Sequence, residues 1–201
     1  MNSMRTLVLG STSPFRKAIL EKLGVPFSCA APDIDETEKA GETAPQLVER
    51  LAEEKAAAVA AGFEDALVIG SDQVAVIDEE ILGKPGNHEK AVEQLTKASG
   101  KTVTFYTGLA VYDAASGVCR SIVEPFKVVF RELTADEIEH YLRVEEPYNC
   151  AGSFKSEALG ITLFDELSGK DPNTLVGLPL ISLTAMLKEF NYDVLAIAAS
   201  Q

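Results

Sequence analysis

The chain has 201 residues, a formal net charge of −13 and a hydrophobic share of 46%. That share is enough for a sizeable core, which argues against intrinsic disorder, and the length suits one globular domain, or one domain with two lobes and a cleft. Because an acidic surface repels polyanions, we expect no general binding to DNA or RNA.

No apolar run approaches the roughly 18 to 20 residues that a membrane-spanning helix needs, so we expect no membrane partner. The first residues, Met1–Thr6, lead into a short apolar stretch without the hydrophobic region of a signal peptide. These features predict a soluble, cytoplasmic protein.

Soft metal ligands are few and scattered along the chain. The cysteines and histidines show neither CxxC nor Cys/His spacing, which argues against a zinc site and favours reduced thiols. These residues are Cys29, Cys119, Cys150, His88 and His140.

The N-terminal segment predicts a strand, a polar turn and a helix. An apolar run at Thr6–Leu9 is followed by apolar residues at helical spacing over Phe15–Leu23, with Pro14 at the first helical position. The turn between them places backbone N–H groups and the Ser11 hydroxyl at a helix N-terminus, which is a ready site for phosphate.

A strand at Phe27–Ala30 and a long helix over Pro45–Ala61 are expected next. Lys55 falls on the apolar stripe of this helix, between Leu51 and Val59. A lysine in that position must reach past the core, be paired, or face a cleft.

Asp72 follows a buried-type strand at Ala66–Gly70 and precedes a further apolar run at Val74–Ile77. Loops after such strands commonly gather ligand-binding groups in α/β proteins. Lys84 lies shortly afterwards, in a Gly-Lys-Pro loop.

The rest of the chain alternates between helical and β-rich patterns, which predicts a mixed sheet with flanking helices. The expected elements are a helix over His88–Ala98, two long strands at Val103–Asp113 and Val118–Phe130 joined as a hairpin, a helix from the capping box at Thr134 to about Arg143, a loop-rich segment at 146–157, a strand around Ile161–Phe164, a loop at 169–173, and a helix over about Leu178–Phe190.

Hydrolysis at a phosphoryl centre needs cations to offset the oxygens and a carboxylate to activate water or hold a divalent metal. Arg16, Lys55 and Lys84 could supply the cations, Ser11 a hydroxyl, and Asp72 the carboxylate. Each residue alone also has a structural interpretation, as a helix cap, a lysine reaching solvent, a loop lysine or a turn. The functional interpretation depends on their occurring together and in this order.

Taken in order, these segments resemble the Maf family of nucleoside triphosphate pyrophosphatases over nearly the whole chain. The segments that carry the resemblance are Leu9–Arg16, Ile34–Glu36, Arg50–Ala56, Gly70–Val74, Gly83–Pro85, Thr107–Gly108 and Val176–Pro179. The resemblance implies a single Maf/ITPase-like α/β domain spanning residues 1–201, with a mixed, mostly twisted sheet, flanking helices and two lobes around a nucleotide cleft. It also suggests a homodimer.

The resemblance further implies cleavage between the α- and β-phosphates of a nucleotide, dependent on a divalent metal cation (Mg²⁺ or Mn²⁺). Asp72 corresponds to the proton acceptor that activates the attacking water, and Glu36 and Asp72 are the metal-binding candidates. The residues that match phosphate-binding positions are Ser11, Arg16, Lys55 and Lys84.

Three departures from the common family pattern resemble the subgroup that acts on 7-methyl-GTP; they are Phe15, Gln73 and Glu157. Methylation at N7 makes guanine cationic, so the face of Phe15 would add cation–π attraction to stacking. Glu157 could accept hydrogen bonds from guanine N1–H and the exocyclic amine, and Gln73 could complete the base or sugar contacts.

Two other functions stay open at this stage. One is a Maf-like pyrophosphatase for unmodified dTTP, UTP or CTP. The other is a non-catalytic nucleotide-binding regulator of cell division. Asp72 beside phosphate-binding lysines favours catalysis, because a sensor does not need a carboxylate that activates water.

Overall fold

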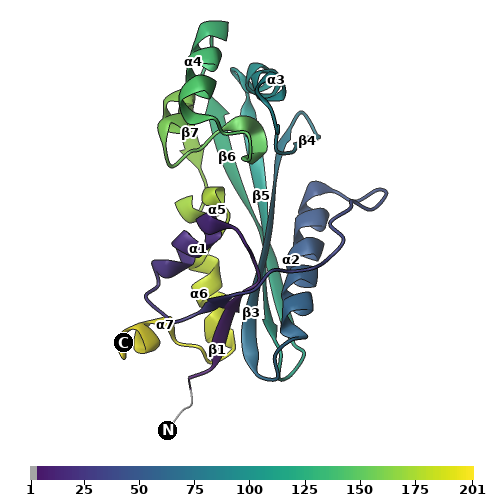
Figure 1. Ribbon diagram of the computed structural model, residues 1–201, viewed down its shortest axis with the longest axis vertical. Coiled ribbons are helices and arrows are strands. Elements are labelled where there is room, and N and C mark those ends of the chain that lie inside the picture. The colour runs from purple at the N-terminus through teal and green to yellow at the C-terminus, as the bar shows by residue number, and fades with distance from the viewer. Residues whose placement is uncertain (1–3) are drawn as a thin grey trace. The chain divides into compact units, whose positions relative to one another are not determined.

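The computed structural model describes residues 4–201 and divides into two compact units (Figure 1). The first unit comprises the described residues through Gln73, together with Thr107–Glu124 and Asp171–Gln201. The second comprises Val74–Tyr106 and Pro125–Lys170. Strands β3 (Ala66–Ile77), β5 (Thr102–Asp113) and β6 (Cys119–Phe130) contribute residues to both.

The first unit arranges its strands in the order β2-β1-β3-β5-β6. Strand β1 pairs in parallel with β2, where Val8 lies opposite Ser28, and in parallel with β3, where Val8 lies opposite Val68. Besides β3, β5 and β6, the unit contains β1 (Thr6–Leu9), α1 (Pro14–Glu21), β2 (Ser28–Cys29), α2 (Ala44–Ala60), α5 (Pro172–Val176), α6 (Leu180–Glu189) and α7 (Val194–Ala198).

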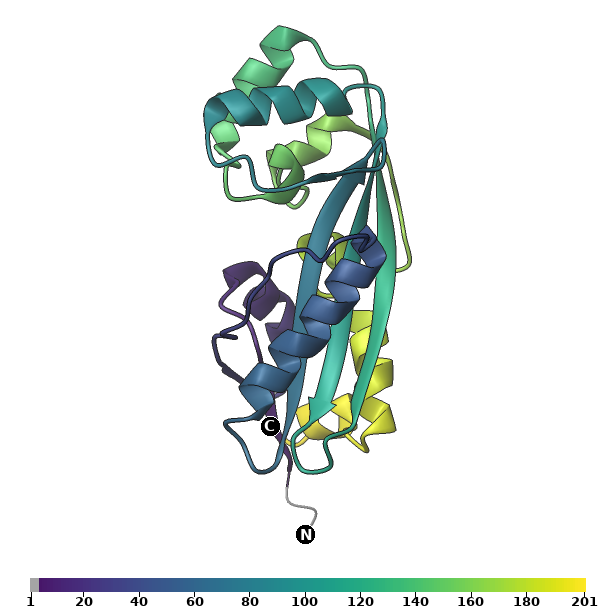
Figure 2. The ribbon, with the colours of Figure 1, turned by 90° about the vertical axis from the view of Figure 1, so that its right-hand side faces the viewer.

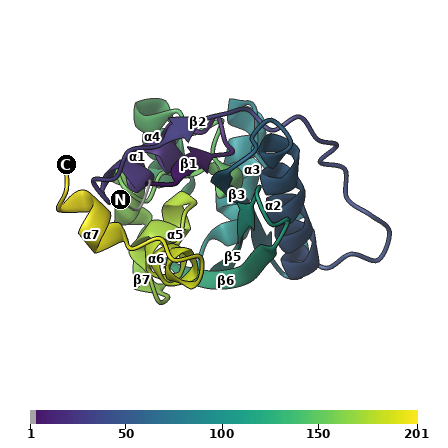
Figure 3. The same cartoon turned by 90° about the horizontal axis from the view of Figure 1, so that it is seen from below.

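Successive side chains along the strands of this unit point to opposite faces of the sheet and form two apolar layers. Leu7, Leu9 and Ile69 belong to a core shared with α1 and α6, whereas Val8 and Val68 pack against α2. Figures 2 and 3 show α2 on one side of these strands and α6 on the other. Because both faces are covered, these strands read as continuous apolar runs.

The second unit holds the far ends of β3, β5 and β6 with two antiparallel neighbours. Strand β4 (Glu80–Leu82) pairs with β3, and β7 (Phe164–Ser168) pairs with β6. The helices of this unit are α3 (His88–Ala98), α4 (Ala135–Glu145), and the 3₁₀ turns η1 (Ala151–Ser153) and η2 (Leu159–Leu163). Phe130 and Phe154 meet edge to face, with ring centroids 5.3 Å apart.

The expected mixed α/β class with flanking helices is confirmed, and two compact units are found where two lobes were expected. The nucleotide cleft stays a prediction. The expectation that Met1–Thr6 carries no signal-peptide region falls partly on residues 1–3, which lie outside the described part. Over residues 4–201, no helix combines the length and hydrophobicity required to cross a membrane.

The structure corrects three details of the expected element order. Residues 71–73, expected between two strands, lie inside the continuous strand β3. The segment expected as a strand at Ile161–Phe164 is mostly η2, because close packing of Gly160 against the Lys155 backbone favours a turn there. The loop expected at 169–173 contains the start of α5.

The spacing of apolar residues did not predict helices α5 and α7, and the reason is the same for both. Each has five residues, so neither completes two turns of an apolar stripe. The start of α5 is capped locally, because Asp171 accepts a hydrogen bond from the Asn173 amide at 2.8 Å and Pro172 opens the helix.

Candidate active site

The turn between β1 and α1 is capped by Ser13. The Ser13 side chain accepts a hydrogen bond from the Arg16 amide at 3.3 Å, and Ser11 Oγ accepts one from the Ser13 amide at 3.0 Å. Pro14 occupies the first turn, where the missing N–H costs nothing. Ser11 is buried, so its hydroxyl stands at a fixed place beside the helix N-terminus.

The Arg16 side chain extends from α1 and contacts the backbone of a segment that is distant in sequence but belongs to the same unit. Its Nε donates to the Gly177 carbonyl oxygen at 2.9 Å. The Ser71 hydroxyl donates to the same oxygen at 3.0 Å. Burial lowers the pKa of Arg16, while the negative charges of Asp72 and Glu36 oppose that shift.

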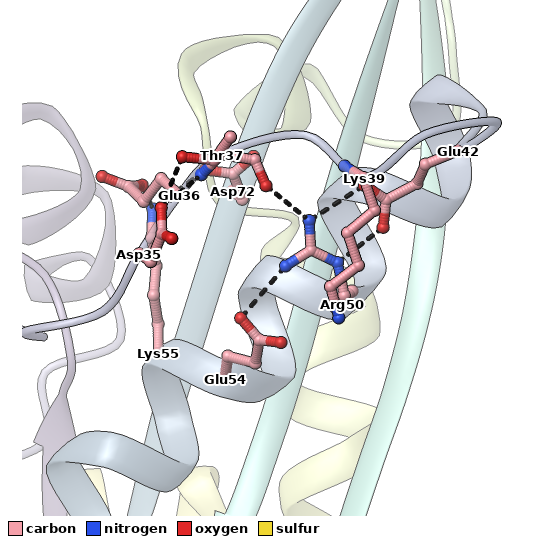
Figure 4. Close-up of polar contacts among 9 residues, drawn as sticks. All are labelled: Asp35, Glu36, Thr37, Lys39, Glu42, Arg50, Glu54, Lys55 and Asp72. Atoms are coloured by element: carbon pink, nitrogen blue, oxygen red, sulfur yellow. Dashed lines mark hydrogen bonds and ion pairs between the residues drawn. The ribbon is translucent and has the colours of Figure 1, made fainter.

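Lys55 is the most informative cation of the site because only 8% of it is exposed. Its Nζ lies 2.8 Å from Asp72 Oδ1 and 2.7 Å from Glu36 Oε1 (Figure 4). Its position on the apolar stripe of α2 thus has a clear cause: the ammonium is paired with two carboxylates, as a buried charge requires.

Asp72 projects from β3 toward Lys55, and its pKa is raised. Burial is the largest cause. The charge and hydrogen bond of Lys55 lower the pKa, as does the charge of Arg16, whereas the charge of Glu36 raises it. A carboxylate with a raised pKa is a stronger base than an exposed one, and it is therefore better suited to accept a proton.

The neighbours of Asp72 along β3 have different partners, as strand alternation requires. Ser71 bonds to Gly177, and Gln73 Nε2 donates to Thr107 Oγ1 at 3.0 Å and to the Thr174 and Leu175 carbonyls at 2.9 and 3.2 Å. The amide nitrogen of Gln73 therefore anchors α5, which leaves its amide oxygen as the atom to meet a ligand.

The first unit thus brings Arg16, Glu36, Lys55 and Asp72 into one electrostatically coupled group. Phe15 lies one residue from Arg16 on α1 and keeps 40% of its surface exposed, as a stacking side chain would. Its role as a specificity residue stays a prediction.

Lys84 and Glu157 belong to the second unit, and both are exposed. Burial raises the pKa of the Cys150 thiol, and this pKa also responds to nearby charges: Lys155 and Lys84 lower it, and Glu157 raises it. The predicted phosphate ligand and the predicted base-reading carboxylate therefore share one neighbourhood. Lys155 and Glu145 are further charges that act on Cys150.

The carboxylates of Glu36 and Asp72 are the metal-binding candidates in the first unit. Both are hard oxygen donors, and both reach the same ammonium group. Within residues 4–201, no cluster of three or more His, Cys, Asp or Glu side chains could hold a metal ion. Two carboxylates fit Mg²⁺, which commonly takes one or two from the protein and its remaining ligands from substrate phosphates and water.

Two residues that contact this site or its neighbouring loop were not assigned from the sequence. Gly177 lies in the quoted segment Val176–Pro179, and Arg50 lies in Arg50–Ala56, but neither received a role. A backbone carbonyl leaves no side-chain signal in a sequence. The Arg50 guanidinium contacts the loop that follows Glu36, a pairing over 8 to 13 positions along the chain.

Comparison with known proteins identifies the family to which the chain is similar. The model of the Maf family, described as "Maf-like protein", matches residues 6–190. The chain is 62% identical over 193 residues to a "7-methyl-GTP pyrophosphatase" of Colwellia psychrerythraea, covering 96% of each sequence. It is 60% identical over 188 residues to a "7-methyl-GTP pyrophosphatase" of Pseudoalteromonas atlantica, covering 94% of this chain and 96% of the relative.

Among solved structures, the chain is similar to one titled "The structure of the Staphylococcus aureus Ham1 protein". The sequence identity is 16% and the TM-score is 0.43, and the match covers 63% of this chain and 72% of the other.

Proposed function

The chain belongs to the Maf family, and on this premise we propose that it hydrolyses 7-methyl-GTP to 7-methyl-GMP and pyrophosphate. Relatives that carry this activity in their names match almost the full length of the chain at 60 and 62% identity. The structural observation that supports catalysis is the partly buried Asp72 carboxylate, which lies 2.8 Å from Lys55 Nζ and interacts electrostatically with Arg16.

In the proposed reaction, Asp72 accepts a proton from water as the water oxygen bonds to phosphorus. The bridging P–O bond of the α–β anhydride breaks, and its electron pair leaves with the departing phosphoryl oxygen. The raised pKa of Asp72 makes this carboxylate a competent acceptor. The Lys55 ammonium, 2.8 Å from Asp72, stands where it can offset the charge of the phosphates.

We assign phosphate binding to one hydroxyl and three cationic side chains, which are Ser11, Arg16, Lys55 and Lys84. Arg16 is pre-oriented by Gly177, so it loses little freedom on binding. A divalent cation (Mg²⁺ or Mn²⁺), held by Glu36 and Asp72, would supply further neutralisation of phosphate charge.

We also propose that the two units act as one Maf-like domain spanning residues 1–201, in a cytoplasmic homodimer.

The activity is tested by pyrophosphate release from 7-methyl-GTP, GTP, dTTP, UTP and CTP with Mg²⁺ or Mn²⁺. We expect kcat/KM to be highest for 7-methyl-GTP. Preference for dTTP, UTP or CTP would keep the reaction class and overturn the substrate. Tight nucleotide binding without turnover would instead favour a non-catalytic regulator.

Replacing Glu157 by Gln tests how the methylated base is recognised. The exchange keeps the size of an exposed side chain but removes the charge that would meet cationic guanine. Because hydrogen bonds to charged groups contribute about 1.5 to 3 kcal/mol, kcat/KM for 7-methyl-GTP should fall by about ten- to a hundredfold. The loss for GTP should be smaller.

Glu166→Gln is the matched control, since Glu166 is another exposed glutamate of the second unit. Equal losses for the methylated and unmethylated substrates in Glu157→Gln would show that Glu157 does not recognise the charge that methylation gives to guanine.

Phe15→Leu should reduce the preference for 7-methyl-GTP over GTP, because it removes the aromatic face and keeps an apolar side chain.

Replacing Gly177 by Ala is expected to displace Arg16. Gly177 has a φ of 124°, which L-residues rarely adopt, and an added Cβ would lie 3.3 Å from Arg16 Nε. The movement should weaken phosphate binding, so KM for the nucleotide should rise by about tenfold, with a smaller change in kcat. Steady-state kinetics of pyrophosphate release measure both values.

Gly117→Ala is the control for backbone strain. Gly117 also has a positive φ, of 75°, but its added Cβ would find no atom nearer than 3.8 Å. The control should lose some stability and keep the wild-type KM. If both variants raise KM equally, the effect comes from strain in general and not from Arg16.

A further inference from the structure

Arg50 lies on α2, five residues before Lys55, and contacts the loop that follows Glu36. Its Nε and Nη2 reach the two carboxylate oxygens of Glu42 at 2.5 and 2.9 Å. Nη2 also donates to the Thr37 carbonyl at 3.1 Å, and Nη1 donates to Glu54 at 3.1 Å (Figure 4). The guanidinium therefore binds the loop over residues 37–42 at both of its ends.

The loop itself is closed by local hydrogen bonds. Asp35 Oδ1 accepts from the amide of Thr37 at 2.9 Å and from its hydroxyl at 2.5 Å. The Lys39 amide donates to Glu42 at 3.0 Å, and the Glu42 amide donates to the Lys39 carbonyl at 3.1 Å. Whatever fixes Thr37 and Glu42 therefore fixes the whole segment.

Glu36 precedes Thr37 directly, so the contact between Arg50 and the Thr37 carbonyl lies one residue from it. The Glu36 side chain is 58% exposed, yet its carboxylate lies 2.7 Å from Lys55 Nζ. An exposed side chain on a loop is held weakly by one ion pair alone. A fixed backbone keeps it in place at a lower entropic cost.

Charge explains why a cation is required at position 50. The carboxylates of Asp35, Glu36 and Glu42 lie along one segment, and Glu36 and Asp72 approach the same Lys55 ammonium at 2.7 and 2.8 Å. Arg50 and Lys55 on α2 offset the repulsion between these carboxylates from the helix side. The planar guanidinium also matches the two oxygens of Glu42, a geometry that a lysine ammonium cannot reproduce.

We propose that Arg50 is a positioning residue that holds the 37–42 loop against α2 and thereby keeps Glu36 beside Asp72 for divalent-metal binding. The inference rests on the proposed function for the metal role of Glu36. Arg50 contacts the loop and Glu54, so it acts through Glu36 and takes no part in the chemical step.

The test compares Arg50→Met, Arg50→Lys and Glu54→Gln in the full chain. Arg50→Met keeps the apolar stem and removes the guanidinium, whereas Glu54→Gln removes an Arg50 partner on α2 and leaves the loop contacts in place. Groups behind metal ligands commonly change metal affinity by about 10- to 100-fold. The Mn²⁺ concentration for half-maximal pyrophosphate release should therefore rise by about tenfold in Arg50→Met, with kcat at saturating Mn²⁺ within about twofold of wild type.

Two measurements without metal separate positioning from general stability. Hydrogen exchange at the Thr37 and Lys39 amides should accelerate in Arg50→Met and stay unchanged in Glu54→Gln. Arg50 also holds the pKa of Glu42 at about 2, and a carboxyl NMR titration should show this pKa returning toward its ordinary value in Arg50→Met. Arg50→Lys should restore the charge without restoring the amide protection.

The outcomes distinguish this inference from the proposed function. A wild-type Mn²⁺ midpoint and wild-type amide protection in Arg50→Met would overturn the positioning role, as would the same changes in Glu54→Gln. Glu36→Gln provides the reference. If it leaves the Mn²⁺ midpoint unchanged while Arg50→Met raises it, Arg50 does not act through Glu36. If no triphosphate is hydrolysed by wild type, the proposed function fails, and amide exchange alone decides whether Arg50 holds the loop.

Discussion

Asp72→Asn is expected to lower kcat for pyrophosphate release by about 10³-fold, within the range typical for loss of a general base. Asparagine keeps the shape and can still accept a hydrogen bond from Lys55 Nζ, which lies 2.8 Å from Asp72 in the wild type. The variant loses only the ability to take a proton and the negative charge. Nucleotide KM, measured at saturating metal, should therefore change by less than about threefold.

The pH dependence follows from the direction of the Asp72 pKa shift. Asp72 must be ionised to accept a proton, and burial raises its pKa above the ordinary 3.8. The rate should thus fall as pH drops through this raised pKa, so the acidic limb lies above the range of an exposed aspartate. The free energy of unfolding depends on pH in the opposite sense. The stabilisation that comes from the raised pKa of Asp72 is complete below pH 3.8, and it is lost as the pH rises through the raised pKa.

Asp65→Asn is the control, since Asp65 is an exposed aspartate of the same unit paired with Arg5. It should leave kcat and the acidic limb unchanged. Retention of more than a tenth of wild-type kcat by Asp72→Asn would exclude Asp72 as the proton acceptor. Thermal unfolding of both variants confirms that the comparison is between folded proteins.

Sequence patterns predicted most of the elements because their signals are local. The capping box at Thr134 depends on short-range side-chain hydrogen bonds, and the structure shows it. Lys55 could be predicted as a candidate site residue because a charged side chain on the apolar stripe of a helix interrupts the pattern of apolar residues. Such local conflicts between pattern and chemistry are expected at functional sites.

Other features depended on contacts that no local pattern encodes. Asp72 was expected at the end of a strand, but Ser71 and Gln73 find partners in α5 and the Gly177 carbonyl, which allows three polar residues inside β3. The Arg50 contacts require the fold of the 37–42 loop. The chemical type of the site residues could therefore be predicted from the sequence, whereas their hydrogen-bonding partners depended on the tertiary structure.

Gly70→Ala is the substitution with the largest expected effect on stability. Gly70 on β3 lies directly beneath α2, and an added Cβ would lie 2.1 Å from the Ala52 carbonyl oxygen and 2.9 Å from the Ala56 amide nitrogen. These are backbone atoms of a helix and cannot rotate away. Overpacking typically costs about 1 to 3 kcal/mol, and a clash with backbone belongs at the upper end or beyond. A loss of about 3 kcal/mol would lower Tm by about 6 to 12 °C in a chain of this size.

Gly62→Ala is the matched control, since Gly62 follows the end of α2 and its added Cβ would meet only the Val59 carbonyl at an ordinary 3.5 Å. Thermal unfolding should separate the two variants by most of the predicted difference. Equal Tm values would mean that α2 can retreat from β3 without cost, and that close packing at Gly70 is not required.

The same substitution connects packing with catalysis, because the helix that must move carries Lys55. Gly108 on β5 repeats the arrangement, since its added Cβ would lie 2.0 Å from the Val48 carbonyl. Two strands thus present glycine to one helix, which lets α2 approach closely enough for Lys55 Nζ to lie 2.8 Å from Asp72. Displacement of α2 in Gly70→Ala should lengthen this contact, so kcat measured well below the new Tm should also fall, whereas Gly62→Ala should retain both stability and activity.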